Sequence, residues 1–188
     1  IEDLTDHYED ILGTYLVKLG SRQIGESNSA ETTELLRLIG DIERIADHSV
    51  NILESVEELH SKELQFSDKA KGELSVLVSA TKEILSLTMS AISTGDLAIA
   101  AKVEPLEEVI DDLKEELRTR HSVRLSQGNC SIETGFVWSD LLTNLERVSD
   151  HCSNVAVAVI KIKDSSFDAH GYLNEIKKGG EPQFVAEF

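Results

Sequence analysis

One stretch of this sequence occurs twice, and the repetition constrains the fold more than any other feature. Residues 41–52 read DIERIADHSVNI, and residues 144–155 read NLERVSDHCSNV. Two copies about a hundred residues apart indicate the duplication of a whole structural unit, not a short solenoid repeat. With the two stretches aligned, the apolar positions agree and five polar positions are identical: Glu43 with Glu146, Arg44 with Arg147, Asp47 with Asp150, His48 with His151, and Asn51 with Asn154.

The apolar residues recur at spacings of three and four along most of the chain, which predicts helices. The 188 residues are 40% hydrophobic and 28% charged, as in a globular protein, and they suffice for one sizeable domain or two small lobes. Pro105 predicts a kink or a late start in the fourth helix. Helices are expected over about residues 1–20, 30–60, 68–93, 97–125 and 131–163.

A second, shorter duplication matches IEDLTD at residues 1–6 with IDDLKE at residues 110–115. Each unit therefore has an acidic helix followed by a helix that carries the longer repeat. The helix expected at 68–93 precedes the second acidic helix and has no counterpart before residue 1. The chain also begins in mid-helix pattern without methionine, which indicates a fragment of a larger protein.

The predicted fold is all-α, a tandem pair of antiparallel three-helix bundles in which the first helix of the first bundle is missing. The first unit is expected over residues 1–62 and the second over residues 66–163. Residues 164–188 are expected to form a C-terminal tail with a short helix at 169–178.

Charge and cysteine usage exclude several classes of partner. A net charge of −17 argues against nucleic acid and against an anionic membrane surface, and favours cations or a basic protein surface. The sequence contains no run of about 18 apolar residues, so it predicts no membrane span. Cys130 and Cys152 form no disulfide framework or zinc motif, which indicates a reducing, cytoplasmic compartment.

Helical geometry places the repeated acids together, on a face turned away from the apolar seam. Four carboxylates would converge where two such helices pack about 8–10 Å apart. A solvated face explains the acidic column of the fourth helix alone, but not five identical polar positions in the repeated pair. The fourth-helix column consists of Glu104, Glu107, Asp111 and Glu115.

Clustered carboxylates repel one another, and a bound cation would compensate them. Oxygen ligands suit iron, manganese, magnesium or, less selectively, zinc. Arg44 and Arg147 are expected to pair with and order neighbouring acids. His48 and His151 either bind the metal, hold its ligands in place, or make structural hydrogen bonds.

Catalytic motifs are lacking. Glu43 and His48 are five residues apart, not in the Glu-x-x-His spacing of di-iron enzymes. The sequence contains no HExxH motif, P-loop or nucleophile elbow, so we do not expect an enzyme.

Two copies of E-R-x-x-D-H-x-x-N, each on a helix that follows an acidic helix, resemble the PhoU family of phosphate-response regulators. The resemblance extends over about residues 1–163. It implies a tandem pair of three-helix bundles whose ExxxD motifs bind iron, zinc or nickel, often as multinuclear clusters on the surface. The matching residues are Glu43 with Asp47, Glu146 with Asp150, Glu107 with Asp111, and, in the first acidic helix, Glu2 and Asp6.

Three stretches resemble, more narrowly, the cytoplasmic PhoU-like domain that follows the membrane part of bacterial sodium/phosphate cotransporters. They are IEDLTDHYEDILGTYLVKL, ELLRLIGDIERIADHSVNI and FDAHGYLNEIKKG. This resemblance implies regulation of phosphate uptake, with the membrane domain of the transporter as partner. Dimerisation stays open. The alternatives are a free-standing PhoU protein that binds a phosphate transporter or sensor kinase, and a structural helical module with solvated acidic faces.

Overall fold

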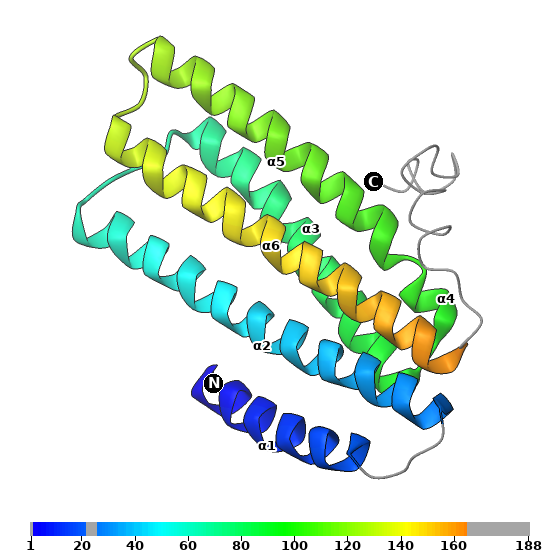
Figure 1. The fold of residues 1–188 in the computed structure, drawn as a ribbon. Coiled ribbons are helices and arrows are strands. Elements are labelled where there is room, and N and C mark those ends of the chain that lie inside the picture. Colours follow the sequence, from blue (N-terminus) through cyan, green and yellow to red (C-terminus); the bar gives the residue numbers. More distant parts are fainter. Residues whose placement is uncertain (1, 22–25, 165–188) are drawn as a thin grey trace.

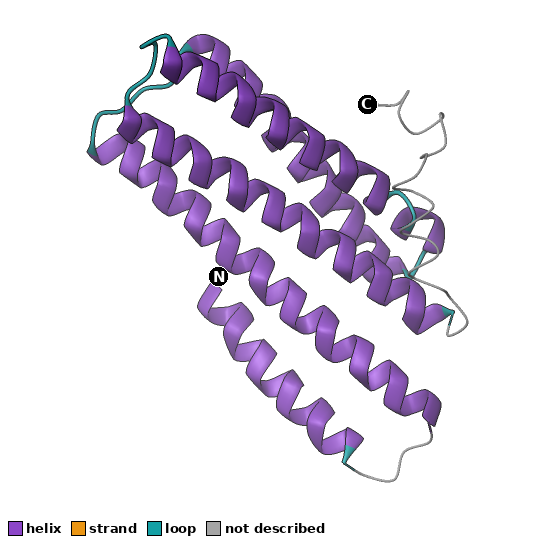
Figure 2. Cartoon of the chain, turned by 45° about the horizontal axis from the view of Figure 1, so that its top comes forward, coloured by secondary structure: helices purple, strands orange, loops and turns teal. Residues whose placement is uncertain are grey.

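The computed structural model describes residues 2–21 and 26–164, and within these ranges the chain is helical without a strand. The helices lie roughly side by side, with α1 on one outer side, then α2, then α6, and α3 and α5 beyond (Figure 1; Figure 2). The all-α prediction is therefore confirmed. The helix expected at 169–178 lies outside the described residues. The helices are α1 (Glu2–Gly20), α2 (Glu26–Ser61), α3 (Asp68–Thr94), α4 (Leu97–Ala100), α5 (Val103–Ser126) and α6 (Ile132–Lys163).

Local side-chain chemistry sets the ends of the helices. Ser67 accepts a hydrogen bond from the Ala70 backbone N–H at the start of α3, and Ser131 accepts one from Thr134 at the start of α6. Gly95 ends α3 in a left-handed conformation with φ of 64°, which costs glycine little. The fourth predicted helix is divided into α4 and α5. Pro105 then lies in the first turn of α5, where its missing N–H leaves no helical bond unmade.

The main hydrophobic core lies between α3, α5 and α6. On α3, the buried residues Ala70, Leu77, Ile84 and Ala91 recur every seven positions, as they do along the seam of packed helices. By length and composition alone, α3 is also the one candidate membrane span among the described residues. A core helix passes the same test, and Leu77, Ile84 and Ala91 are fully buried in this bundle.

The first unit is open where the second is closed. Helix α1 packs on α2, and α2 packs most extensively on α6. Tyr8 of α1 is 54% exposed, whereas Leu117, the equivalent residue of α5, is 4% exposed beneath α3. No helix among the described residues covers α1 and α2 as α3 covers α5 and α6.

We predict that Leu77→Ala lowers the free energy of unfolding by about 2–5 kcal/mol, because it leaves a cavity in the main core. Chemical denaturation followed by circular dichroism measures the change. Val76→Ala is the matched control, since Val76 is adjacent on the same helix but 56% exposed. Equal losses in the two variants would show that α3 does not pack as described.

Candidate metal centres

The repeated histidines lie where α2 and α6 cross, and they join the two units. His48 Nδ1 is 2.9 Å from Asn144 Oδ1, and His151 Nδ1 is 2.8 Å from Asp41 Oδ1. Since residue 41 aligns with residue 144, each histidine reaches the same position of the other repeat. The two imidazole rings stack with centroids 5.5 Å apart and planes at 19°.

The repeated asparagines complete the same contact. Asn51 Nδ2 donates to Asn144 Oδ1 at 3.4 Å, and Asn154 Nδ2 donates to Asp41 Oδ1 at 3.3 Å. In each unit, therefore, one side-chain oxygen contacts both the histidine and the asparagine of the other unit. Of the three roles expected for the histidines, the geometry favours structural hydrogen bonding.

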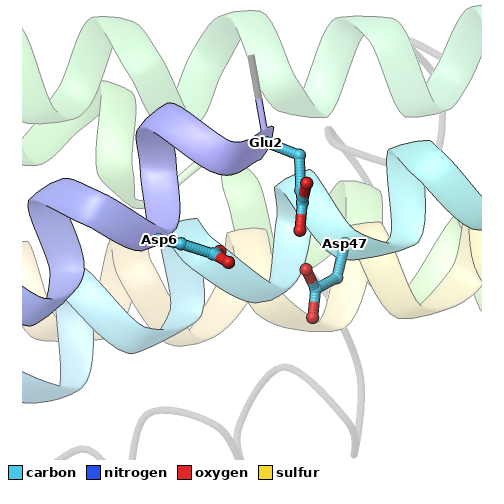
Figure 3. A group of neighbouring side chains, drawn as sticks. All are labelled: Glu2, Asp6 and Asp47. Carbon is cyan, nitrogen blue, oxygen red and sulfur yellow. The ribbon is translucent and has the colours of Figure 1, made fainter.

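The first group of acids, here the N-terminal acid cluster, consists of Glu2, Asp6, Glu43 and Asp47. Glu2 and Asp6 come from α1 and Asp47 from α2, and their carboxylate oxygens lie within 4.8 Å of one another (Figure 3). Burial raises the pKa of Glu43, and the charge of Asp47 and a hydrogen bond with it add to the effect. The nearby charge of Asp6 is the main cause that raises the pKa of Glu2. The structure thus brings together the four residues predicted for this unit.

The second group, here the α5–α6 acid cluster, consists of Glu104, Glu107, Glu108 and Asp150. Oxygens of the three glutamates lie within 4.8 Å of one another. Burial, followed by the charges of Glu104 and Asp150, raises the pKa of Glu107 to about 8. Glu104 is only 4% exposed and accepts a hydrogen bond from Ser153 Oγ. Glu104, Glu107 and Asp150 face a pocket of about 500 Å³ between α2, α5 and α6.

The third group of acids already surrounds a cation. Lys114 Nζ lies 3.4 Å from Asp111, 3.1 Å from Glu115 and 3.5 Å from Glu146. The four residues predicted for the second unit are therefore divided. Glu107 and Asp150 belong to the α5–α6 acid cluster, and Asp111 and Glu146 belong to the lysine-centred group.

The arginines of the two repeats differ in their contacts. Arg147 pairs with Asp150 at 2.8 Å and lies 3.7 Å from Glu146, so it orders these acids as expected. Arg44 is exposed and takes part in none of the ion pairs found among the described residues.

Alignment of α1 with α5 shows where the two units diverge. With Ile1 on Ile110, Lys114 corresponds to Thr5, whose hydroxyl donates to the Glu2 carbonyl at 2.8 Å. Within the described ranges, no lysine or arginine forms an ion pair with the N-terminal acid cluster. The first unit therefore has the same arrangement of acids without the internal ammonium.

Sequence reasoning missed several residues of these sites. Asp41 and Asn144 begin the two repeated stretches and are both short polar residues, a signal that was present in the alignment. Helical periodicity places Glu104 in the acidic column of the fourth helix without indicating that it is a ligand, and Glu108 lies outside that column. Lys114 gave no signal, because its position among acids depends on the packing of α5 on α6.

We predict that Glu107→Gln flattens the pH dependence of stability in the presence of a chelator. A carboxyl group whose pKa is about 8 in the folded state and 4.5 in the unfolded state makes stability fall as pH rises between these values. Glutamine does not ionise, so the variant should lose part of that fall and be more stable than wild type at pH 8. Urea denaturation at several pH values measures the effect, with exposed Glu57→Gln as control. If stability depends on pH in the same way in wild type and in Glu107→Gln, the raised pKa of Glu107 is contradicted.

Comparison with known proteins agrees with this architecture. The chain is 28% identical over 147 residues to the phosphate-specific transport system accessory protein PhoU homolog 1 of Thermotoga maritima, and these residues are 78% of this chain and 62% of that relative. The crystal structure of PhoU from Pseudomonas aeruginosa superposes with a TM-score of 0.78 at 21% identity, covering 88% of this chain and 79% of that one. The family model described as the PhoU domain matches residues 1–56 and 74–159. The chain belongs to the PhoU family.

Proposed function

We propose that this chain regulates phosphate uptake by binding a phosphate transporter, and that bound metal ions order the surface it presents. The family match over both repeats carries the proposal. The Thermotoga maritima relative is named as an accessory protein of a phosphate-specific transport system, which supports a regulatory role over a catalytic one. The aligned residues span 62% of the length of that relative. A transporter as the partner of this chain is therefore proposed and not carried over from the relative.

Two kinds of transporter fit this role. The accessory protein among the relatives favours a PhoU protein that binds a separate phosphate transporter or a sensor kinase. The stretches that resemble the cotransporter domain support the second candidate, a module on the cytoplasmic side of a sodium/phosphate cotransporter. The two candidates differ in whether the regulated uptake requires sodium.

The N-terminal acid cluster is the first metal site in this proposal. Its four ligands are carboxylates, which suit iron, manganese or zinc, and nickel remains a further candidate. The charge of Asp6 raises the pKa of Glu2, and burial followed by the charge of Asp47 raises that of Glu43. A bound cation would replace the protons that those shifts favour. The α5–α6 acid cluster is the second site, with Glu104, Glu107 and Asp150 facing its pocket.

Thr5→Lys is the sharpest test of the first site. The substitution copies Lys114 of the second unit and places an ammonium among Glu2, Asp6 and Glu43. We expect the affinity of the N-terminal acid cluster for zinc or manganese to fall at least about tenfold. The reason is that the lysine ammonium would compensate the carboxylates in place of the metal ion. Equilibrium dialysis with elemental analysis measures the metal bound per chain.

Thr14→Lys is the matched control, since it adds the same charge to an exposed position of the same helix. It should bind as much metal as wild type. Equal metal content in wild type, Thr5→Lys and Thr14→Lys would refute the N-terminal acid cluster as a metal site.

The regulatory role is tested in a bacterial strain that lacks its own PhoU protein. Expression of the chain should restore the repression of radiolabelled phosphate uptake in phosphate-rich medium, and Asp6→Ala with Asp47→Ala should weaken the repression. Replacing sodium with potassium in the assay separates the two kinds of transporter. If the wild-type chain leaves uptake unchanged in both salts, the regulatory proposal fails.

A further inference from the structure

A second pocket lies between α5 and α6, toward the turn that joins them, and the acid clusters do not use it. Its volume is about 400 Å³, within the range of small-molecule sites. Its walls come from residues 114–125 of α5 and residues 132–143 of α6. The α5–α6 acid cluster lies toward the opposite ends of the same two helices (Figure 1).

The lining of this pocket contains basic side chains and no carboxylate, in contrast to the acidic composition of the whole chain. Lys114, Arg118 and His121 are among its lining residues, and none of the described lining residues is an aspartate or glutamate. The whole chain has 35 acidic residues against 18 basic ones, so a wall without a carboxylate is unusual here. Lys114 is already shared among three acids. The Arg118 side chain is 71% exposed, and its ion pair with Glu115 is long, at 3.7 Å.

The floor of the pocket contains polar ring atoms without partners. His121 and Trp138 both line it, and neither His121 Nε2 nor Trp138 Nε1, both buried, has a hydrogen-bond partner among the described residues. The two rings stack with centroids 5.7 Å apart. Burial, together with the charge of Arg124, lowers the pKa of His121, so its neutral ring offers Nε2 as a donor or an acceptor.

Glycine keeps the histidine side of the pocket open. A Cβ atom at Gly135 would lie 2.9 Å from His121 Nε2, closer than atoms of these kinds approach. The rest of the wall combines the hydroxyl side chains of Ser122, Ser139 and Thr143 with apolar side chains. Two of the apolar side chains project outward, since Ile132 is 71% and Phe136 67% exposed. Leu125 and Leu142 line the same pocket. A hollow with an exposed arginine at its rim, apolar side chains and buried ring nitrogens without partners has the composition of a site for a ligand that is charged at one end.

We infer that this pocket binds a small organic anion with an apolar body, such as an aryl or alkyl phosphate or carboxylate. The anionic group lies at Arg118, near the rim. The apolar body lies against Phe136, Leu125 and Leu142, and a ligand atom that reaches the floor supplies a partner for His121 Nε2. The inference is independent of metal binding and of the transporter.

Trp138 is the only tryptophan of the chain and lines the pocket, so its fluorescence reports on this site directly. We expect phenyl phosphate to change the emission of the full chain saturably at concentrations up to about 5 mM, a range that detects weak specific binding. Benzyl alcohol lacks the charge and inorganic phosphate lacks the apolar body. Each should bind at least about tenfold more weakly than phenyl phosphate.

Arg118→Ala should weaken phenyl phosphate binding about tenfold, the change expected when one charged hydrogen bond is lost. Arg44→Ala is the matched control, because it removes the same side chain from an exposed position on α2, outside the pocket. Gly135→Ala should also weaken binding, by bringing a methyl group against His121. Circular dichroism checks that each variant is folded.

Three outcomes would overturn the inference. The first is no saturable change with phenyl phosphate. The second is equal binding of phenyl phosphate and inorganic phosphate, or of phenyl phosphate and benzyl alcohol. Either result would show that the pocket does not require a ligand with both an anionic group and an apolar body. The third is an unchanged affinity in Arg118→Ala, a surface variant whose folding does not depend on the pocket.

Discussion

The crossing of α2 and α6 is the contact on which the rest of this structure depends. His48 and His151 stack there, and each reaches an oxygen of the other repeat. Hydrogen bonds that are made in pairs across two copies of one motif define the register between the helices, because a shift by one residue would break all of them. With the register fixed, Glu43 and Asp47 of α2 face α1, while Glu146 and Asp150 of α6 face α5. The histidine contacts therefore determine which acids come together, although the histidines themselves belong to none of the acid groups.

The acid groups show different ways in which a protein compensates carboxylates that are packed together. In the lysine-centred group an ammonium lies between Asp111, Glu115 and Glu146. In the α5–α6 acid cluster a proton does part of this work, since the pKa of Glu107 is raised to about 8. In the N-terminal acid cluster the aligned position is Thr5, and the ion pairs of the described residues include none with its acids. A metal ion would be the third kind of compensation, which is why this cluster is the first metal site of the proposed function.

Helix α5 carries both of the electrostatic environments of the second unit. Its first half holds Glu104, Glu107 and Glu108, and its second half holds Arg118 and His121. Lys114 lies between these halves, where it contacts Asp111, Glu115 and Glu146 and also lines the pocket. The α5–α6 acid cluster and the pocket therefore lie on one helix, with the lysine-centred group between them.

The sequence by itself determined the helical class, the duplication and most helix boundaries, because 3.6-residue periodicity, capping residues and Gly95 act locally. Helical periodicity placed Glu43 and Asp47 on one face, and the resemblance to the PhoU family predicted that Glu2 and Asp6 belong with them. Only the tertiary structure decided how α5 and α6 pack. That packing separates Glu107 and Asp150 from Asp111 and Glu146, inserts Lys114 between the latter two, and adds Glu104 to the former. The tertiary structure also placed the repeated histidines between α2 and α6, where they connect the two units. Helical periodicity fixes the face on which a side chain lies, whereas rotation and axial shift between helices, which depend on the whole core, fix what that side chain contacts.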